Sequence, residues 1–338
     1  MRDVNLCMHL LELEITTKCN LNCLHCYNRG NKNMDMEYNE IIKYINFAND
    51  NNVNTFVLSG GEACLHKDFL KICKYVRKNR KKLLNIKKII VQSNGYIGNV
   101  VDLKELVGFD YVHLSFDIDD NGLRKISSNH TIELAKDIKN NGGNVYLFTT
   151  IHKGNLNQLD EIVKCANNNK IDIAFNFCID TGRDREFLLT AEEKKLAIDK
   201  LIMYEREGKI NKLKNPYVNS YKKMSQNEGE FRIKGGCTAG IAACAIKTNG
   251  DVIPCPFLRV TAGNIHNDNL EDIWQKSTLF KVLRNRQKYD ICGKCKYLSY
   301  CGGCRKSAYE TSGSLNGYDK NCIMKGEMEN DRKLANEC

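Results

Sequence analysis

The chain has 338 residues, of which 42% are hydrophobic and 27% charged, a composition typical of a soluble globular protein. No stretch approaches about 18 uncharged apolar residues, and the N-terminal segment lacks the apolar core of a secretory signal. The net charge of +10 comes from lysines spread along the chain without interleaved aromatic residues, which favours a solvated surface. We therefore expect a cytoplasmic protein with no nucleic-acid partner and no membrane partner.

The first 210 residues alternate strand-like and helix-like segments. The predicted strands are Leu11–Thr16, Thr55–Ser59, Ile89–Gln92, Tyr111–Phe116, Val145–Thr150 and Ile171–Phe177. The predicted helices are Tyr38–Asn49, Lys67–Lys78, Asn99–Val107, Thr131–Lys139, Leu156–Asn167 and Ala191–Glu207. This alternation predicts an α/β fold with a parallel sheet, and six such units suit a partial (β/α)6 barrel of the TIM type.

The organisation changes after residue 210. Residues 211–236 are polar and irregular and predict a linker, because they contain Pro216 and several glycines. Nine of the 17 cysteines lie between Cys237 and Cys338. In a reducing cytosol so many cysteines indicate metal or cluster binding rather than disulfides. We expect a barrel domain at 1–210, a linker at 211–236 and a small cysteine-rich domain at 237–338.

Three closely spaced cysteines follow the first predicted strand. Cys19, Cys23 and Cys26 have the spacing CxxxCxxC. A four-iron cluster normally takes four cysteine ligands, so three leave one iron open to a substrate or cofactor. A zinc site is the alternative, although zinc usually takes four ligands and this group supplies three.

Polar or reactive residues also follow the other predicted strands. They are Ser59, Gly60, Gly61 and Glu62, then Ser93, Asn94 and Gly95, then Ser115 and Asp117, then His152, and finally Asn176 and Cys178. In parallel barrels the active site gathers at the carboxyl ends of the strands, so this pattern predicts a single site at the mouth. Gly60 and Gly61 would allow a close backbone approach to a ligand, although a plain tight turn is the alternative for them.

The cysteine triad, the Ser-Gly-Gly-Glu turn and the six strand–helix units resemble the radical S-adenosylmethionine (radical SAM) superfamily over residues 8–210. The resemblance implies that the triad holds a [4Fe-4S] cluster whose open iron binds the methionine part of S-adenosylmethionine. Glu62 matches the position that helps to hold the cofactor's amino group. Four further residues resemble positions that line the cofactor pocket: Ser93, Asn94, Ser115 and Asp117. One departure is Ala63-Cys64, where the family often has proline.

The resemblance also implies the reaction. One electron, from a flavodoxin- or ferredoxin-type donor, enters the cluster and S-adenosylmethionine is cleaved to a 5′-deoxyadenosyl radical. That radical removes a hydrogen from an unreactive carbon of the substrate, while the protein supplies position and protection. Cys178 is a candidate hydrogen-atom donor to a substrate radical, because it follows the sixth strand near the mouth.

The later cysteines resemble a SPASM domain over residues 231–325, which implies two auxiliary four-iron clusters. By position, the first would be held by Cys237, Cys244, Cys255 and Cys304, and the second by Cys292, Cys295, Cys301 and Cys322. Cys301 and Cys304 are separated by two residues where the sulfatase-maturing members have three. Those members also carry an acidic base where this chain has Pro256. Because proline cannot accept a proton, we do not expect sulfatase maturation from this protein. Such clusters either relay electrons or only stabilise a small domain. Taken alone, the four cysteines from Cys292 to Cys304 would suit a zinc site equally well.

Three functions are consistent with this pattern. Many relatives modify ribosomally made peptides or proteins by crosslinking or oxidation, and we favour that reading. Only eighteen residues precede Cys19, which leaves no room there for a peptide-binding domain, so we expect a separate carrier or direct docking. The segments Cys301–Arg305 and Pro254–Phe257 equally resemble enzymes of small-molecule chemistry such as side-chain decarboxylation in a haem-type pathway. The third reading is a non-enzymatic iron–sulfur electron carrier.

Overall fold

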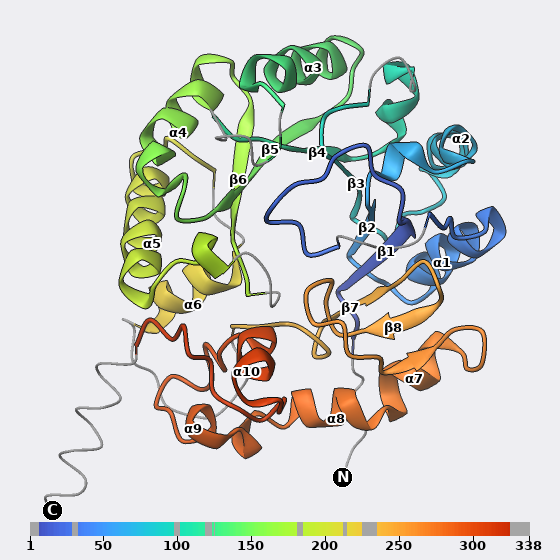
Figure 1. Ribbon diagram of the computed structural model, residues 1–338. Coiled ribbons are helices and arrows are strands. Elements are labelled where there is room, and N and C mark those ends of the chain that lie inside the picture. The colour runs from blue at the N-terminus through green and yellow to red at the C-terminus, as the bar shows by residue number, and fades with distance from the viewer. Residues whose placement is uncertain are drawn as a thin grey trace, which may run out of the picture.

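The computed structural model describes residues 7–28, 33–97, 102–118, 124, 126–180, 185–211, 215–224 and 235–324. Its centre is a nine-stranded sheet in the order β6-β5-β4-β3-β2-β1-β7-β8-β9 (Figure 1). The first six strands are parallel to their neighbours. They are β1 (Leu10–Thr16), β2 (Thr55–Gly60), β3 (Lys88–Ser93), β4 (Tyr111–Ser115), β5 (Val145–Ile151) and β6 (Asp172–Phe177). The predicted partial barrel and its six strands are confirmed.

Five helices cover the outer face of this sheet (Figure 1). They are α1 (Tyr38–Asp50), α2 (Phe69–Asn79), α3 (Ser128–Asn140), α4 (Leu159–Asn168) and α5 (Ala191–Arg206). In α1 the buried residues Ile41, Tyr44, Ile45 and Ala48 recur at three- and four-residue spacing, so one stripe of the helix faces the core. A capping box between Thr190 and Glu193 begins α5.

One predicted helix takes a different form. Of the predicted helix Asn99–Val107, residues 99–101 lie outside the described residues, and Leu103–Gly108 form a 3-10 helix. The side chain of Asp102 caps its first turn, and Gly108 lies so close to α2 that a Cβ atom there would meet Arg77 at 2.8 Å. This close packing leaves room for one short, tight turn rather than an α-helix.

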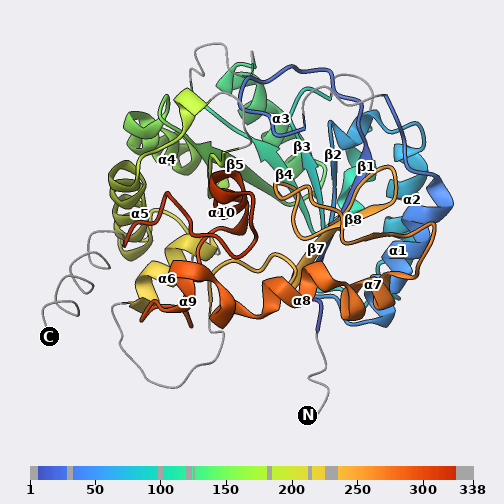
Figure 2. The same cartoon turned by 60° about the horizontal axis from the view of Figure 1, so that its bottom comes forward.

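The C-terminal part extends the barrel sheet. Strand β7 (Ala243–Ile246) pairs in parallel with β1, and β8 (Asp251–Ile253) and β9 (Gly263–Asn264) follow antiparallel. Four helices come next: α7 (Leu270–Lys276), α8 (Thr278–Arg284), α9 (Asp290–Gly293) and α10 (Arg305–Ser312). In both views α9 and α10 lie beside α6, and α8 lies below β7, along the open side of the barrel (Figure 2). The division at 210 and 237 stays a prediction, and the sheet itself runs across it.

The expected irregular linker contains a helix. Pro216–Met224 form α6, with proline at the first helical position, where its missing N–H costs nothing. Lys222 of α6 forms an ion pair of 2.5 Å with Glu205 of α5. Packing against α5 therefore stabilises a helix that the polar composition of this segment does not predict.

The strands separate an apolar outer face from a mixed inner face. On β1, Leu11, Leu13 and Ile15 join the core under the helices. Because side chains alternate along a strand, Glu12 and Glu14 face the inside of the barrel. The inner-facing side chains of β4 and β5 are only half-buried, which indicates an inner space on that side.

An ion pair joins β1 to the loop after β8. Both carboxylate oxygens of Glu14 accept hydrogen bonds from the guanidinium of Arg259, at 2.6 and 2.9 Å. Glu14 is wholly buried, and its backbone oxygen also accepts a hydrogen bond from Thr248 at 2.8 Å. A second ion pair, Lys320 with buried Asp180 at 3.0 Å, joins the C-terminal part to the loop after β6.

We expect Arg259→Met to destabilise the protein by about 3 kcal/mol, because it leaves the carboxylate of Glu14 buried and unpaired. Arg259→Lys keeps the charge but loses the two-point contact, so its loss of stability should be smaller. Urea unfolding of the two variants and the parent measures these differences. A Met variant as stable as the parent would contradict the account.

Candidate cluster and cofactor site

The three N-terminal cysteines lie together in the loop after β1. Burial, together with the neighbouring thiols of Cys26 and Cys19, raises the pKa of Cys23 to about 12, while the charge of Arg124 opposes the rise. A thiol in such a place is protonated until a metal or cluster displaces its proton. The loop therefore presents three neighbouring thiols, and their role as cluster ligands stays a prediction.

The base of this loop is fixed by Asp35. Its carboxylate accepts a hydrogen bond from Thr16 Oγ1 at 2.7 Å and forms an ion pair with Lys18 at 2.6 Å. The backbone N–H of Thr17 donates to Met34 O at 2.9 Å. These contacts hold the chain on the approach to Cys19 before any ligand binds.

The Gly-Gly turn packs directly against that approach. The N–H of Gly61 donates to Thr16 O at 2.8 Å, and the N–H of Glu62 donates to Lys18 O at 2.7 Å. A Cβ atom on Gly60 would lie 2.3 Å from Thr16 O, and one on Gly61 would lie 2.3 Å from Lys18 O. The close approach predicted for these glycines is thus made to the chain's own backbone, and contact with a cofactor stays a prediction.

Glu62 braces the ends of two strands. Its Oε2 accepts a hydrogen bond from the N–H of Asn94 at 2.6 Å, and its Oε1 accepts one from the N–H of Cys64 at 3.1 Å. The side chain is wholly buried, and burial raises the pKa of its carboxyl while these hydrogen bonds oppose the rise. The brace ties β3 to the turn after β2, next to the cysteine loop.

Asn94 connects the end of β3 with the triad. Its Nδ2 lies 3.7 Å from the sulfur of Cys19 and donates to Asn20 Oδ1 at 2.9 Å. Ser93 is buried: its Oγ accepts from Gly95 N at 3.1 Å, and its side chain also interacts with the carboxyl of Glu62. Of these two predicted cofactor residues, Asn94 therefore lies in direct contact with the cluster loop.

A buried ion pair places charge near the triad. Asp117, after β4, binds Arg124 at 2.9 Å, and Arg124 also donates to Asn94 O at 2.8 Å. Both charges act on the thiol of Cys23. Asn155, which donates to Asp117 Oδ1 at 3.3 Å, completes the group. The sequence pattern singled out Asp117 but missed Arg124 and Asn155, which lie farther along the loops after β4 and β5 and belong to no recognisable motif.

The remaining predicted residues lie around the same mouth. His152 stacks on His25 of the cysteine loop, with 5.8 Å between ring centroids. Ser115 ends β4, and Asn176 lies on β6 with its Oδ1 accepting from the following N–H. Cys178 follows β6, where its N–H donates to Ile151 O at 2.8 Å. Its role as a hydrogen-atom donor stays a prediction.

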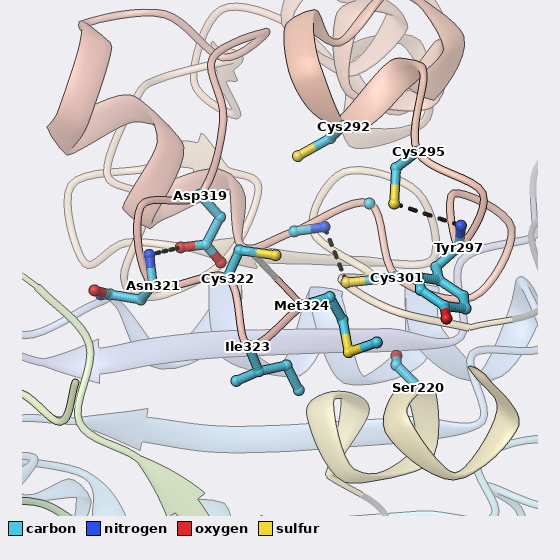
Figure 3. Close-up of a pocket in the computed structure, with 12 residues that line it drawn as sticks. Ser220, Cys292, Cys295, Tyr297, Cys301, Asp319, Asn321, Cys322, Ile323 and Met324 are labelled. Atoms are coloured by element: carbon cyan, nitrogen blue, oxygen red, sulfur yellow. Dashed lines mark hydrogen bonds between the residues drawn. The ribbon is translucent and has the colours of Figure 1, made fainter. Parts of the chain in front are cut away.

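A second group of thiols lines a cavity in the C-terminal part. Figure 3 shows the side chains of Cys292, Cys295, Cys301 and Cys322 turned toward one space, with Met324 and Ile323 on its wall. Burial raises the pKa of Cys301 to about 12 and that of Cys322 to about 11. These are the four residues that the sequence assigns to one auxiliary cluster.

The other predicted group assembles only in part. Cys255 is influenced by the charges of Cys237 and Cys304, so these three thiols lie near one another. Cys244 does not join them: it lies on β7 with its sulfur 3.7 Å from that of Met8, wholly inside the core. The assignment of Cys244 to this cluster stays a prediction.

Two buried arginines accompany the C-terminal thiols. Arg305 lies 3.6 Å from Cys292 Sγ, and Arg286 donates to Cys237 O at 2.7 Å. They are 1% and 2% exposed, and in the part of the chain that the structure describes neither forms an ion pair with a carboxylate. Four thiolates around an iron–sulfur core of about +2 carry a net negative charge, which these cations would balance. The surroundings therefore fit an anionic cluster.

The arrangement suits clusters better than single metal ions. Within the described ranges, no three His, Cys, Asp or Glu side chains converge closely enough to hold one metal ion. A zinc site needs four ligands around a single point, whereas each thiol of a four-iron cluster binds a different iron. The four thiols around the cavity instead leave room for a larger group between them.

Comparison with known proteins agrees with this arrangement. Residues 13–166 match the family model of the Radical SAM superfamily, and residues 237–296 match that of an iron–sulfur cluster-binding domain, SPASM. No helix among the described residues is long and apolar enough to cross a membrane.

Similar proteins cover nearly the whole chain. An AdoMet-dependent heme synthase of Methanosarcina barkeri is 24% identical over 94% of this chain and 96% of its own length. The mycofactocin maturase MftC of Mycolicibacterium smegmatis is 26% identical over 93% of this chain and 82% of its own. Among solved structures, Streptococcus suis SuiB bound to S-adenosylmethionine superposes with a TM-score of 0.76 at 22% identity, over 93% of this chain and 77% of SuiB.

We expect Cys255→Ala to lower the iron content of the purified protein, because it removes one of three clustered ligands. Cys244→Ala is the matched control and should leave the iron content unchanged, since its thiol packs in the core. Iron and sulfide analysis of both variants measures this. Equal iron loss in the two variants would show that Cys244 is a ligand after all.

Proposed function

Since the chain belongs to the radical SAM superfamily and carries a SPASM domain, we propose that it modifies a ribosomally synthesised peptide or protein by crosslinking or oxidation. Its cofactors are [4Fe-4S] clusters and S-adenosylmethionine. The observation that carries the proposal is the pairing of a three-thiol loop at the barrel mouth with a four-thiol cavity in the same chain. An electron-transfer protein would not need the first, because three ligands leave an iron open.

The residues of the chain would position the cofactors and the substrate, whereas the cofactors would supply the reactivity. When bound, the cluster and S-adenosylmethionine supply a radical that removes hydrogen from an unreactive carbon. Cys19, Cys23 and Cys26 would hold the cluster, and the Gly60–Glu62 turn fixes their loop by backbone hydrogen bonds. The barrel would enclose the reacting carbon of the substrate and so exclude water from it.

A peptide substrate is supported by relatives, one named as a maturase and one solved with a peptide. MftC is the maturase, and SuiB has been solved with its precursor peptide SuiA. We further propose a flavodoxin- or ferredoxin-type electron donor and, for a peptide substrate, a separate carrier or direct docking. A reducing compartment, the cytoplasm, suits the many free thiols of this chain.

A second candidate is side-chain decarboxylation of a porphyrin precursor. It is favoured by the similarity to AdoMet-dependent heme synthase, which extends over 96% of that protein. The two candidates differ in the size of the substrate that must reach the barrel interior.

Mass spectrometry separates the two candidates. The reconstituted, reduced protein is incubated with S-adenosylmethionine and either candidate precursor peptides or porphyrin precursors. Peptide modification predicts a mass loss of about 2 Da for one crosslink or oxidation, since two hydrogens leave. Loss of carbon dioxide from the porphyrin, with unchanged peptides, would contradict the first candidate.

We expect Cys292→Ala to leave cleavage of S-adenosylmethionine partly intact and to abolish product, because Cys292 lies in the four-thiol cavity, far along the chain from the triad. The measurement is the ratio of product to 5′-deoxyadenosine in variant and parent. Product formation at the parent's ratio would rule out an electron relay through this cavity.

A further inference from the structure

Two carboxyl groups on the inner face of β1 have unlike surroundings. Glu14 is wholly buried, and both its oxygens accept hydrogen bonds from Arg259. Glu12, two residues earlier, accepts one hydrogen bond, from Ser59 Oγ at 2.6 Å, and is 7% exposed. Among the described residues no donor is recorded for its second oxygen. One carboxylate is therefore fully paired, and the other keeps an oxygen for a ligand.

Glu12 lies where two carboxyl groups share one positive charge. From β1 it faces Glu14, from β2 Ser59, from the cysteine loop Tyr27, and from the loop after β8 Arg259. The guanidinium of Arg259 is thus the positive charge near both carboxyls, and it already donates hydrogen bonds to Glu14. Burial raises the pKa of Glu12 to about 7, and the charge of Glu14 adds to the rise, while Ser59 and Arg259 oppose it. A buried carboxyl whose pKa lies near neutral pH is suited to accept or donate a proton.

The position of Glu12 is suited to meeting a substrate. It projects into the barrel from β1, the strand that leads to the cysteine loop. Across the barrel, the inner-facing side chains of β4 and β5, such as His113 and Phe148, are only half-buried. Arg259 also donates to Pro256 O at 3.3 Å, next to Cys255. Glu12 therefore lies on the inner wall, on the strand that leads to the cysteine loop and near Arg259 of the segment that carries Cys255.

We propose that Glu12 is the proton acceptor for the substrate during the oxidative half of the reaction. The inference rests on the proposed function. Forming a crosslink or a double bond removes two hydrogens from the substrate, and the first leaves as an atom to the 5′-deoxyadenosyl group. The second leaves as a proton and an electron: the proton forms an O–H bond on the Glu12 carboxylate. An oxidised four-iron cluster, which thiols such as those of Cys292, Cys295, Cys301 and Cys322 would hold, would accept the electron.

Glu12→Gln tests the proposal, because glutamine keeps the size and the hydrogen bond to Ser59 but accepts no proton. We expect 5′-deoxyadenosine to form at close to the parent's rate, while product falls by about 100-fold, the scale of a lost general base. Glu133→Gln, an exposed carboxyl on α3, is the matched control and should leave both unchanged.

Ser59→Ala provides an independent variant. Removing the hydrogen bond that stabilises the Glu12 carboxylate should raise its pKa further. Product formation should then need a higher pH than in the parent, where it rises through about pH 7 as Glu12 loses its proton. A merely structural Ser59–Glu12 contact would lower stability without moving this pH profile.

Infrared titration of the protein without S-adenosylmethionine gives a readout independent of turnover. A protonated-carboxyl band that disappears near pH 7 should be seen in the parent and be missing from Glu12→Gln. The difference between the two spectra separates this band from that of the buried carboxyl of Glu62, which both proteins keep. Parent-level product from Glu12→Gln, or a missing band in the parent, overturns the role of Glu12 and leaves the proposed function standing. Absence of 5′-deoxyadenosine with the parent overturns the proposed function and the role of Glu12 with it.

Discussion

Backbone contact between the Gly60–Gly61 turn and the segment Thr16–Lys18 is the constraint on which the site depends. It leaves no space for a side chain at either glycine, and it sets where the cysteine loop leaves β1. Glu62 extends the contact to the end of β3 through the N–H of Asn94, and Asn94 reaches Cys19. Three strand ends are thus locked together by hydrogen bonds before any cofactor contributes.

Strand β1 also connects the two thiol-bearing parts of the molecule. It pairs with β2 on one side and with β7 on the other, so the sheet continues from the barrel into the C-terminal segment. Glu14 binds Arg259 from the loop that carries Cys255. The geometry of the barrel mouth and that of the C-terminal thiols are therefore set by the same strand, which suits a reaction that needs both.

The sequence could predict the features that follow a repeating pattern. The six strands, the polar strand ends and the four thiols of the cavity follow from alternation, from parallel topology and from the resemblance. It could not predict α6, because packing against α5 overrides a polar composition. It missed Arg124, whose contacts to Asp117 and Asn94 are set by tertiary structure. It could not predict that Cys244 packs beside Met8 in the core, since spacing does not tell which face of a strand a thiol occupies.

The formation of 5′-deoxyadenosine tests the central claim most directly. The reduced, reconstituted protein is mixed with S-adenosylmethionine, beside a variant in which Cys19, Cys23 and Cys26 are replaced by alanine. The account predicts 5′-deoxyadenosine from the parent and none from the variant, because only the triad leaves an iron open for the cofactor. No 5′-deoxyadenosine from the parent, or equal amounts from both proteins, would contradict it.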